Sequence, residues 1–194
     1  MLIAALYGAG SGALHAVSGP DHLLSLGPLA LSRPKQPWRL GLSWGLGHGA
    51  GTLLLGLPVL LLTQLGGLAA LALWGDRLAG LALLGTAAWS ALSLRARASD
   101  RAHEQRSPLL VGFVHGVTGA AGLLLVLPLL VRGSALHVAL FLAMFALSGA
   151  LAMASLTSLI ARLGARLAPR QVRRVQLAAI AASALLGLSW LLAG

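Results

Sequence analysis

The sequence has 194 residues, of which 58% are hydrophobic and only 9% are charged, and its formal net charge is +10. A soluble domain carries about 25% charged residues, so this chain has too little polar surface to fold as a globule in water. We therefore predict an all-α integral membrane protein. The absence of cysteine excludes a disulfide scaffold and a thiolate metal site.

Six apolar runs divide the chain, each bounded by charged residues or by clusters of Pro and Gly. A helix needs roughly 20 apolar residues to cross a bilayer. In chain order the predicted spans are residues 2–31, 40–63, 68–94, 108–131, 135–161 and 171–193. Asp76 and Arg77 interrupt the third span, for which a shorter version starting near Arg77 is the alternative. The N-terminus lacks the basic region of a cleavable signal peptide, so we expect it to be part of the first span.

The positive charges are unevenly distributed over the predicted loops. Twelve of the fourteen Lys and Arg residues lie in loops 1–2, 3–4 and 5–6, whereas Arg77 and Arg132 lie on the other side. By the positive-inside rule these three loops are cytoplasmic and both termini are outside. We therefore expect a multi-pass protein of the cell membrane that contacts the lipid bilayer. Such short loops offer no folded basic face, so we expect no nucleic-acid partner.

Two segments one hundred residues apart resemble each other. Eight of eighteen positions are identical between GALHAVSGPDHLLSLGPL at 12–29 and GFVHGVTGAAGLLLVLPL at 112–129. Chance similarity between Leu- and Gly-rich helices is the alternative. A true repeat of three spans places the second unit inverted in the membrane, as in many secondary transporters. We predict a single membrane domain over 1–194, with repeat one about 1–95, a cytoplasmic loop about 95–107 and repeat two about 108–194.

Three ionisable residues, His15, Asp21 and His22, lie inside the first predicted span. Ionisable groups within a membrane are costly unless they face partners or a wet cavity, which makes each a functional candidate. In a straight helix, with about 1.5 Å rise and 100° per residue, His15 and His22 are roughly 10 Å apart and Asp21 points elsewhere. An unbroken helix therefore cannot direct all three at one ion.

The dipeptide Gly19-Pro20 allows the helix to break between these residues. Proline removes a backbone donor and disfavours helical geometry at the residue before it, while glycine accepts almost any dihedral angles. We predict that the first helix of each repeat is interrupted near the midplane, at Ser18-Gly19-Pro20 and at Thr118-Gly119. The first break would bring the three side chains together.

His48, in the second span, is predicted to join them. Counting the helical rise from the span ends places it at a depth within about 4 Å of Asp21 and His22. The glycines of WGLGHGAG around it permit close helix approach. We therefore predict a metal site of His15, Asp21, His22 and His48. His115, at a similar depth, is a secondary candidate: a ligand, a hydrogen-bond partner of a ligand, or a remnant of the repeat.

Imidazoles with one carboxylate and no thiolate suit Ni²⁺, Co²⁺, Zn²⁺, Cu²⁺ or Fe²⁺. Because the site lies on a broken membrane helix and must bind its ion reversibly, we interpret it as a site through which the ion is transported. The main alternative is a haem-binding or electron-transfer subunit that uses His15, His48, His115 and His137 as axial ligands. A membrane metallo-hydrolase is less favoured, since the chain carries no motif of that chemistry. We expect no enzymatic activity and no resident cofactor.

The motifs also resemble a known family. HAVSGPDH matches the His-x5-Asp-His signature of the six-span nickel permeases of the nickel/cobalt transporter superfamily, related to HupE, UreJ and UreH and most similar to the urease-accessory UreH type. WGLGHGAG and FVHGVTGAAG are similar to two further motifs of that family. The resemblance implies import of Ni²⁺, or Co²⁺, into the cytoplasm with His15, Asp21, His22 and His48 as metal residues. It does not identify a downstream metallochaperone.

Overall fold

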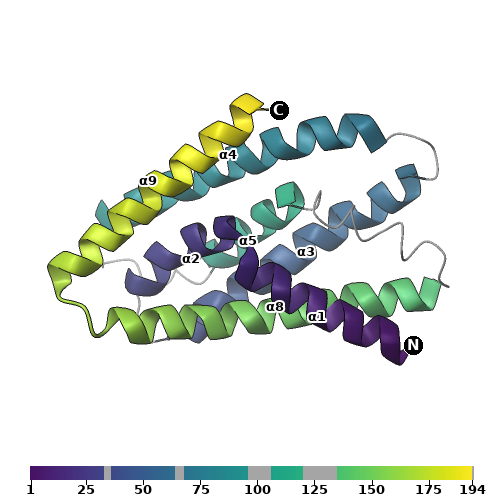
Figure 1. The fold of residues 1–194 in the computed structure, drawn as a ribbon, viewed down its shortest axis with the longest axis horizontal. Coiled ribbons are helices and arrows are strands. Elements are labelled where there is room, and N and C mark those ends of the chain that lie inside the picture. Colours follow the sequence, from purple (N-terminus) through teal and green to yellow (C-terminus); the bar gives the residue numbers. More distant parts are fainter. Residues whose placement is uncertain (33–35, 64–67, 96–105, 120–134, 194) are drawn as a thin grey trace.

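The computed structural model describes residues 1–32, 36–63, 68–95, 106–119 and 135–193 (Figure 1). In these ranges the chain forms seven helices and no strand. They are α1 (Leu2–Ser18), α2 (Pro20–Ser32), α3 (Pro37–Thr63), α4 (Leu68–Arg95), α5 (Arg106–Gly119), α8 (Ala135–Gly164) and α9 (Pro169–Ala193). The all-helical fold predicted from the sequence is confirmed.

The helices match the predicted spans closely. Three helices begin at proline, at Pro20, Pro37 and Pro169, because the first turn of a helix needs no donor from that residue. Helix α4 continues through Asp76 and Arg77, so these residues do not interrupt the helix of the third predicted span. The described part of α5 ends at Gly119, where the second break was predicted, and residues 120–134 beyond it lie outside the described residues, as do residues 96–105, which make up most of the predicted 95–107 loop.

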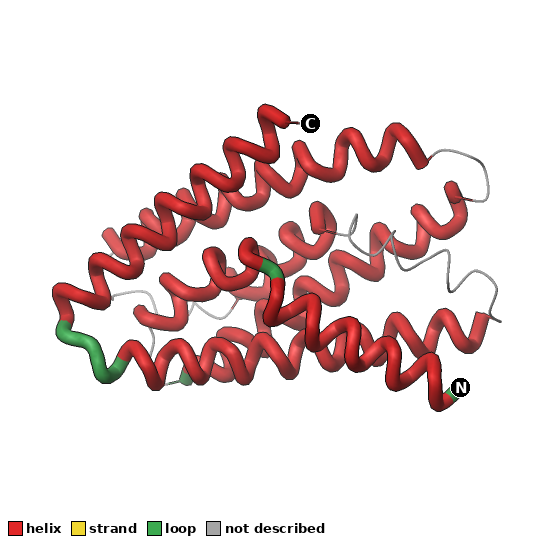
Figure 2. The backbone as a smooth tube through the Cα atoms, in the orientation of Figure 1, coloured by secondary structure: helices red, strands yellow, loops and turns green. Residues whose placement is uncertain are grey.

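The first span is broken at Gly19, as predicted (Figure 2). Gly19 has φ −69° and ψ 110°, an extended conformation that any residue adopts and that a following proline favours. Its N–H still donates to the carbonyl of His15 at 3.1 Å, and its carbonyl accepts from Leu23 at 3.3 Å. The chain therefore changes direction within one residue, and α2 starts at once with Pro20 and Asp21 in its first turn.

Close helix packing surrounds this break. Helix α3 packs along both α5 and α8, α1 packs along α8, and α4 packs along α9 (Figure 1). Glycines face backbone at the α3–α5 contact: a Cβ at Gly47 or Gly51 would meet the backbone of α5, and one at Gly112 or Gly116 would meet that of α3. Such small residues let two helices approach closely in a membrane, which brings His48 and His115 onto adjoining faces.

The buried face of α1 consists of Gly8, Gly12 and Ala16, spaced four residues apart. A Cβ on Gly12 would meet the backbone carbonyl of Phe145 in α8, whereas a Cβ on Gly10 meets nothing within 4 Å among the described residues. We expect Gly12→Val to destabilise the protein by about 1–3 kcal/mol, because overpacking forces α1 off α8. The apparent melting temperature in detergent measures this effect. Gly10→Val is the matched control, and an equal loss there would contradict the packing argument.

Two of the described helices, Leu136–Gly164 of α8 and Pro169–Leu192 of α9, are long and apolar enough to cross a membrane, with mean hydropathies of 2.1 and 1.9. Only 17% of the apolar window of α9 is buried, so most of its apolar surface faces outward. Large exposed apolar side chains also cover α1, among them Leu2, Ile3 and Leu6. An apolar surface of this extent indicates a membrane-associated protein. Two such helices fall short of the six predicted crossings.

Candidate metal centre

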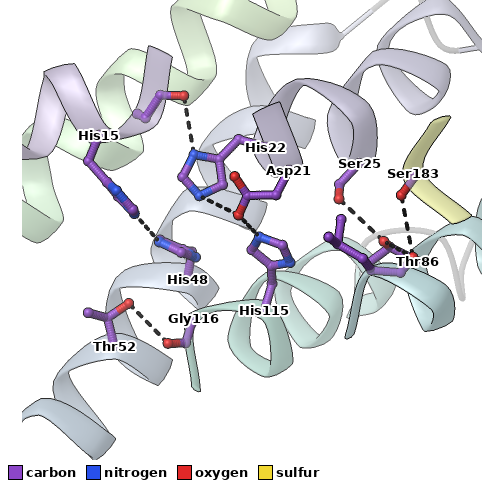
Figure 3. Close-up of polar contacts among 12 residues, drawn as sticks. His15, Asp21, His22, Ser25, His48, Thr52, Thr86, His115, Gly116 and Ser183 are labelled. Atoms are coloured by element: carbon purple, nitrogen blue, oxygen red, sulfur yellow. Dashed lines mark hydrogen bonds and ion pairs between the residues drawn. The ribbon is translucent and has the colours of Figure 1, made fainter. Parts of the chain in front are cut away.

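Five ionisable side chains from four helices meet around the break (Figure 3). His15 comes from the last turn of α1, Asp21 and His22 from the first turn of α2, His48 from α3 and His115 from α5. We call these five residues the His/Asp cluster. His22, His48 and His115 are buried, and the side chain of Asp21 is only 14% exposed. The sequence-predicted residues are therefore brought together in space.

The break positions His22 against the end of α1. The ring centres of His15 and His22 lie 4.7 Å apart, whereas the straight helix of the sequence argument separates them by roughly 10 Å. In a continuous helix the carbonyl of Ala16 would accept from residue 20, but Pro20 has no N–H. That carbonyl instead accepts from Nδ1 of His22 at 3.3 Å. A neutral His22 therefore carries its lone pair on Nε2, on the other side of the ring.

Three imidazoles form the first group of candidate ligands. Nε2 of His15 lies 3.4 Å from Nε2 of His48, and one ligand atom from each of His15, His22 and His48 lies within 4.8 Å of the others. Nitrogen ligands of a tetrahedral metal ion at about 2.0–2.1 Å are about 3.3–3.4 Å apart. The hydrogen-bonded pair from His15 and His48 already has that spacing, so an ion that replaces this hydrogen bond needs only His22 to move closer to complete a three-nitrogen site.

Asp21, His22 and His115 form the second group, whose ligand atoms also lie within 4.8 Å of one another. Nε2 of His115 donates to Oδ2 of Asp21 at 2.7 Å, and Nε2 of His22 lies 3.6 Å from the same oxygen. The position of Asp21 in the first turn of α2 also favours its negative charge, because the N-terminal end of a helix dipole is positive. Of the three roles considered for His115, the structure shows contact with a candidate ligand.

Buried polar atoms without a hydrogen-bond partner test whether the cluster fits a cation. Nε2 of His22, Nδ1 of His48 and Nε1 of Trp44 are buried, and among the described residues none has a hydrogen-bond partner. Buried polar groups in native proteins are satisfied in the large majority of cases. For Nε2 of His22, which bears the lone pair when the ring is neutral, a cation is a suitable partner. The donor set of the cluster therefore fits a divalent ion.

Trp44 closes the cluster on one side and was not identified from the sequence. Its indole is fully buried, stacks on His48 at 5.2 Å between ring centres, and contacts His22 and His115 at 5.5 and 5.1 Å. The ring centre of Phe145, in α8, lies 5.5 Å from the ring centre of His15. The available signal was the four-residue spacing of Trp44 and His48, which places both on one face of α3. These aromatic rings exclude water from the imidazoles.

Buried hydroxyl groups extend from the cluster between α2, α4 and α9, and these too were missed. Ser25, one turn after Asp21, lies 3.3 Å from the hydroxyl of Thr86. The carbonyl of Leu83 accepts from Thr86 at 2.9 Å and from Ser183 at 3.4 Å (Figure 3). Hydrogen bonds of this kind hold membrane helices together. They join α2 to α4 and α4 to α9.

The geometry favours a small ion over a haem. The rings of His15, His22, His48 and His115 contact one another with centres 4.7 to 5.7 Å apart, which leaves no space for a macrocycle between them. His137, the other candidate axial ligand, contacts the N-terminal amine of Met1 at 3.0 Å and is not in the cluster.

The chain is similar to two curated plant proteins. It is 34% identical over 174 residues to the chloroplast protein FOR GROWTH AND FERTILITY 2 of Arabidopsis thaliana, a match covering 81% of this chain and 46% of the relative. It is 35% identical over 173 residues to the chloroplast protein FOR GROWTH AND FERTILITY 1 of the same plant, covering 77% and 47%. The chain thus spans about half the length of these relatives.

No family model matches the chain, and no solved structure matches it. The assignment to the nickel/cobalt transporter superfamily and its HupE, UreJ and UreH branch is therefore wrong: the curated relatives are the two chloroplast proteins. The description of the chain as a nickel or cobalt permease is corrected with it. A short motif such as HAVSGPDH specifies a helix break flanked by imidazole and carboxylate side chains, and this local geometry does not identify a family.

Proposed function

We propose that this chain is a multi-span membrane protein that binds a divalent transition-metal ion in the His/Asp cluster and carries it across the membrane. The observation that supports this most strongly is the meeting of four imidazoles and one carboxylate from four helices, with ligand atoms of each trio within 4.8 Å. Such groups are costly in lipid and are retained at pathways for ions and substrates. The proposal stands on these residues and not on the relatives' names.

The ligand chemistry defines the class of ion. Imidazole nitrogens favour first-row transition metals, while Mg²⁺ and Ca²⁺ prefer sets of oxygen ligands. Asp21 supplies one negative charge, which offsets part of the charge of a dication, and it is one of four acidic residues in the chain. Helices α3 and α5 supply the imidazoles of His48 and His115 beside it. A divalent ion with nitrogen preference is therefore the expected substrate.

We further propose the six-crossing arrangement, with α1 and α2 together as the first crossing and the three Arg-rich loops on one side. The connection between α8 and α9 lies at one end of the bundle and the N-terminus at the other (Figure 1), which supports this arrangement. In it the second crossing would be α3, and the His/Asp cluster would lie within the bilayer, between the first, second and fourth crossings.

Metal accumulation in cells tests the proposal. Cells that produce the chain are incubated with a panel of divalent ions from Mn²⁺ to Zn²⁺, and their metal content is measured by mass spectrometry. We expect accumulation of at least one ion to change by about 10-fold, unaffected by excess Mg²⁺ or Ca²⁺. The Asp21→Asn protein should insert into the membrane but give background levels. Equal metal content with the wild type, with Asp21→Asn and without the protein would refute transport through this site.

A further inference from the structure

The two ligand trios share one residue. His22 belongs both to the group with His15 and His48 and to the group with Asp21 and His115. No other residue of the cluster appears in both groups among the described residues. A residue that is not part of the cluster orients the ring of His22, because Nδ1 of His22 donates to the backbone carbonyl of Ala16. His22 can therefore remain a ligand while the other two ligands change.

The two trios differ in the charge of their ligands. The trio of His15, His22 and His48 offers only imidazole nitrogens, and Nε2 of His15 and Nε2 of His48 are hydrogen-bonded to each other at 3.4 Å. The trio with Asp21 includes a carboxylate, and its Nε2–H···Oδ2 hydrogen bond between His115 and Asp21, at 2.7 Å, occupies the space an ion needs. In each trio two candidate ligand atoms are thus hydrogen-bonded to each other, and an ion would replace that hydrogen bond in either position.

We infer that the His/Asp cluster is two alternative positions for one ion, and that His22 passes the ion from His15 and His48 to Asp21 and His115. This inference rests on the proposed transport function. In the transfer, the bonds from the metal to His15 and His48 break. The Asp21–His115 hydrogen bond opens, the proton on Nε2 of His115 moves to Nδ1 of the same ring, and the carboxylate and the freed Nε2 bind the ion. The protein as a whole gains and loses no proton.

Only one position is filled at a time. The two positions share a ligand, so two dications would lie within a few ångströms of each other, where their repulsion is large. Multiple weak positions of this kind suit transport, because an ion must bind well enough to lose its water and weakly enough to leave. A carboxylate in the second position compensates the ion's charge after two neutral ligands have been lost.

Zn²⁺ binding by the purified full chain in detergent tests the inference. X-ray absorption counts the imidazoles around the bound ion, and equilibrium dialysis gives the stoichiometry. We expect one Zn²⁺ in the wild type. Asp21→Asn should retain one Zn²⁺ with three imidazoles, and His48→Ala should retain one with two. His15→Ala and His115→Gln repeat the test of each position, and His137→Ala, outside the cluster, is the matched control.

A transport measurement on the same variants distinguishes failure of the two-position inference from failure of the proposed transport function. We expect both Asp21→Asn and His48→Ala to lose the roughly 10-fold change in cellular metal content given by the wild type while still binding Zn²⁺, because each keeps only one position. If either variant folds, as judged by size-exclusion chromatography, but binds no Zn²⁺, the cluster is a single composite site and the inference is overturned. Two Zn²⁺ bound at once would overturn it as well. A wild type that binds no metal would instead refute the proposed function itself.

Discussion

The His22→Ala protein is expected to lose more than about 100-fold in affinity for the transported ion. Loss of a group that only orients a ligand costs about 10–100-fold, and His22 is the one residue common to both ligand trios. The substitution also leaves the carbonyl of Ala16 without the donor that it has at 3.3 Å. Metal binding by the purified protein, measured by competition with a chelating dye, checks the affinity.

A separate variant distinguishes lost binding from lost folding. His22 is fully buried, so truncation to Ala creates a cavity that destabilises the helix contact by itself. Glutamine at this position retains most of the volume and an amide that can donate to Ala16, but no imidazole. We expect His22→Gln to elute as the wild type does in size-exclusion chromatography and to bind as poorly as His22→Ala. Wild-type affinity in His22→Gln would exclude His22 as a ligand.

The break in the first span could be predicted because its cause is local. Two adjacent residues, Gly19 and Pro20, are enough to end one helix and start the next, and the structure has the break at that place. From the sequence alone, the role of Gly19 was attributed to its conformational freedom, and that reason was incomplete. Gly19 has ordinary extended angles, so its conformational freedom is not used. What matters is the absence of a Cβ beside the cluster.

The partners of each imidazole depend on contacts that a single sequence does not reveal. The hydrogen bond between His115 and Asp21 joins residues 94 positions apart, and it requires the close contact of α3 with α5. The stacking of Trp44 on His48 likewise depends on the side-chain rotamers in the packed bundle. Depth arguments placed the histidines at one level, but which nitrogen faces which oxygen is decided by packing.

The motif resemblance correctly predicted the local geometry around the helix break, but the family that it implied was wrong. The pattern of HAVSGPDH specifies a histidine before a break and an Asp-His pair after it, which explains why the predicted site residues meet. Any membrane protein that needs ligands at a broken helix can use the same arrangement, because function resides in the site and not in the surrounding fold. The residues therefore gave a sound prediction of the geometry and a wrong prediction of the relatives.

Gly19→Ala is expected to reduce metal affinity about 100-fold although alanine is compatible with the backbone. A Cβ built on Gly19 would lie 2.6 Å from Nδ1 of His22 and 2.8 Å from Oδ1 of Asp21, closer than such atoms approach. The methyl group would push His22 off the carbonyl of Ala16 and move Asp21, and losses of about 10–100-fold follow when the groups that orient a ligand are disturbed.

Gly27→Ala is the matched control for this effect, since a Cβ there meets nothing within 4 Å among the described residues. Both substitutions replace glycine by alanine next to or within α2, so they change the conformational entropy of the unfolded chain similarly. We expect Gly27→Ala to bind metal as the wild type does and Gly19→Ala to bind weakly with a near-normal melting temperature. Equal binding by both proteins would show that the space beside Gly19 does not hold the ligands, and that the metal site, if present, lies elsewhere in the bundle.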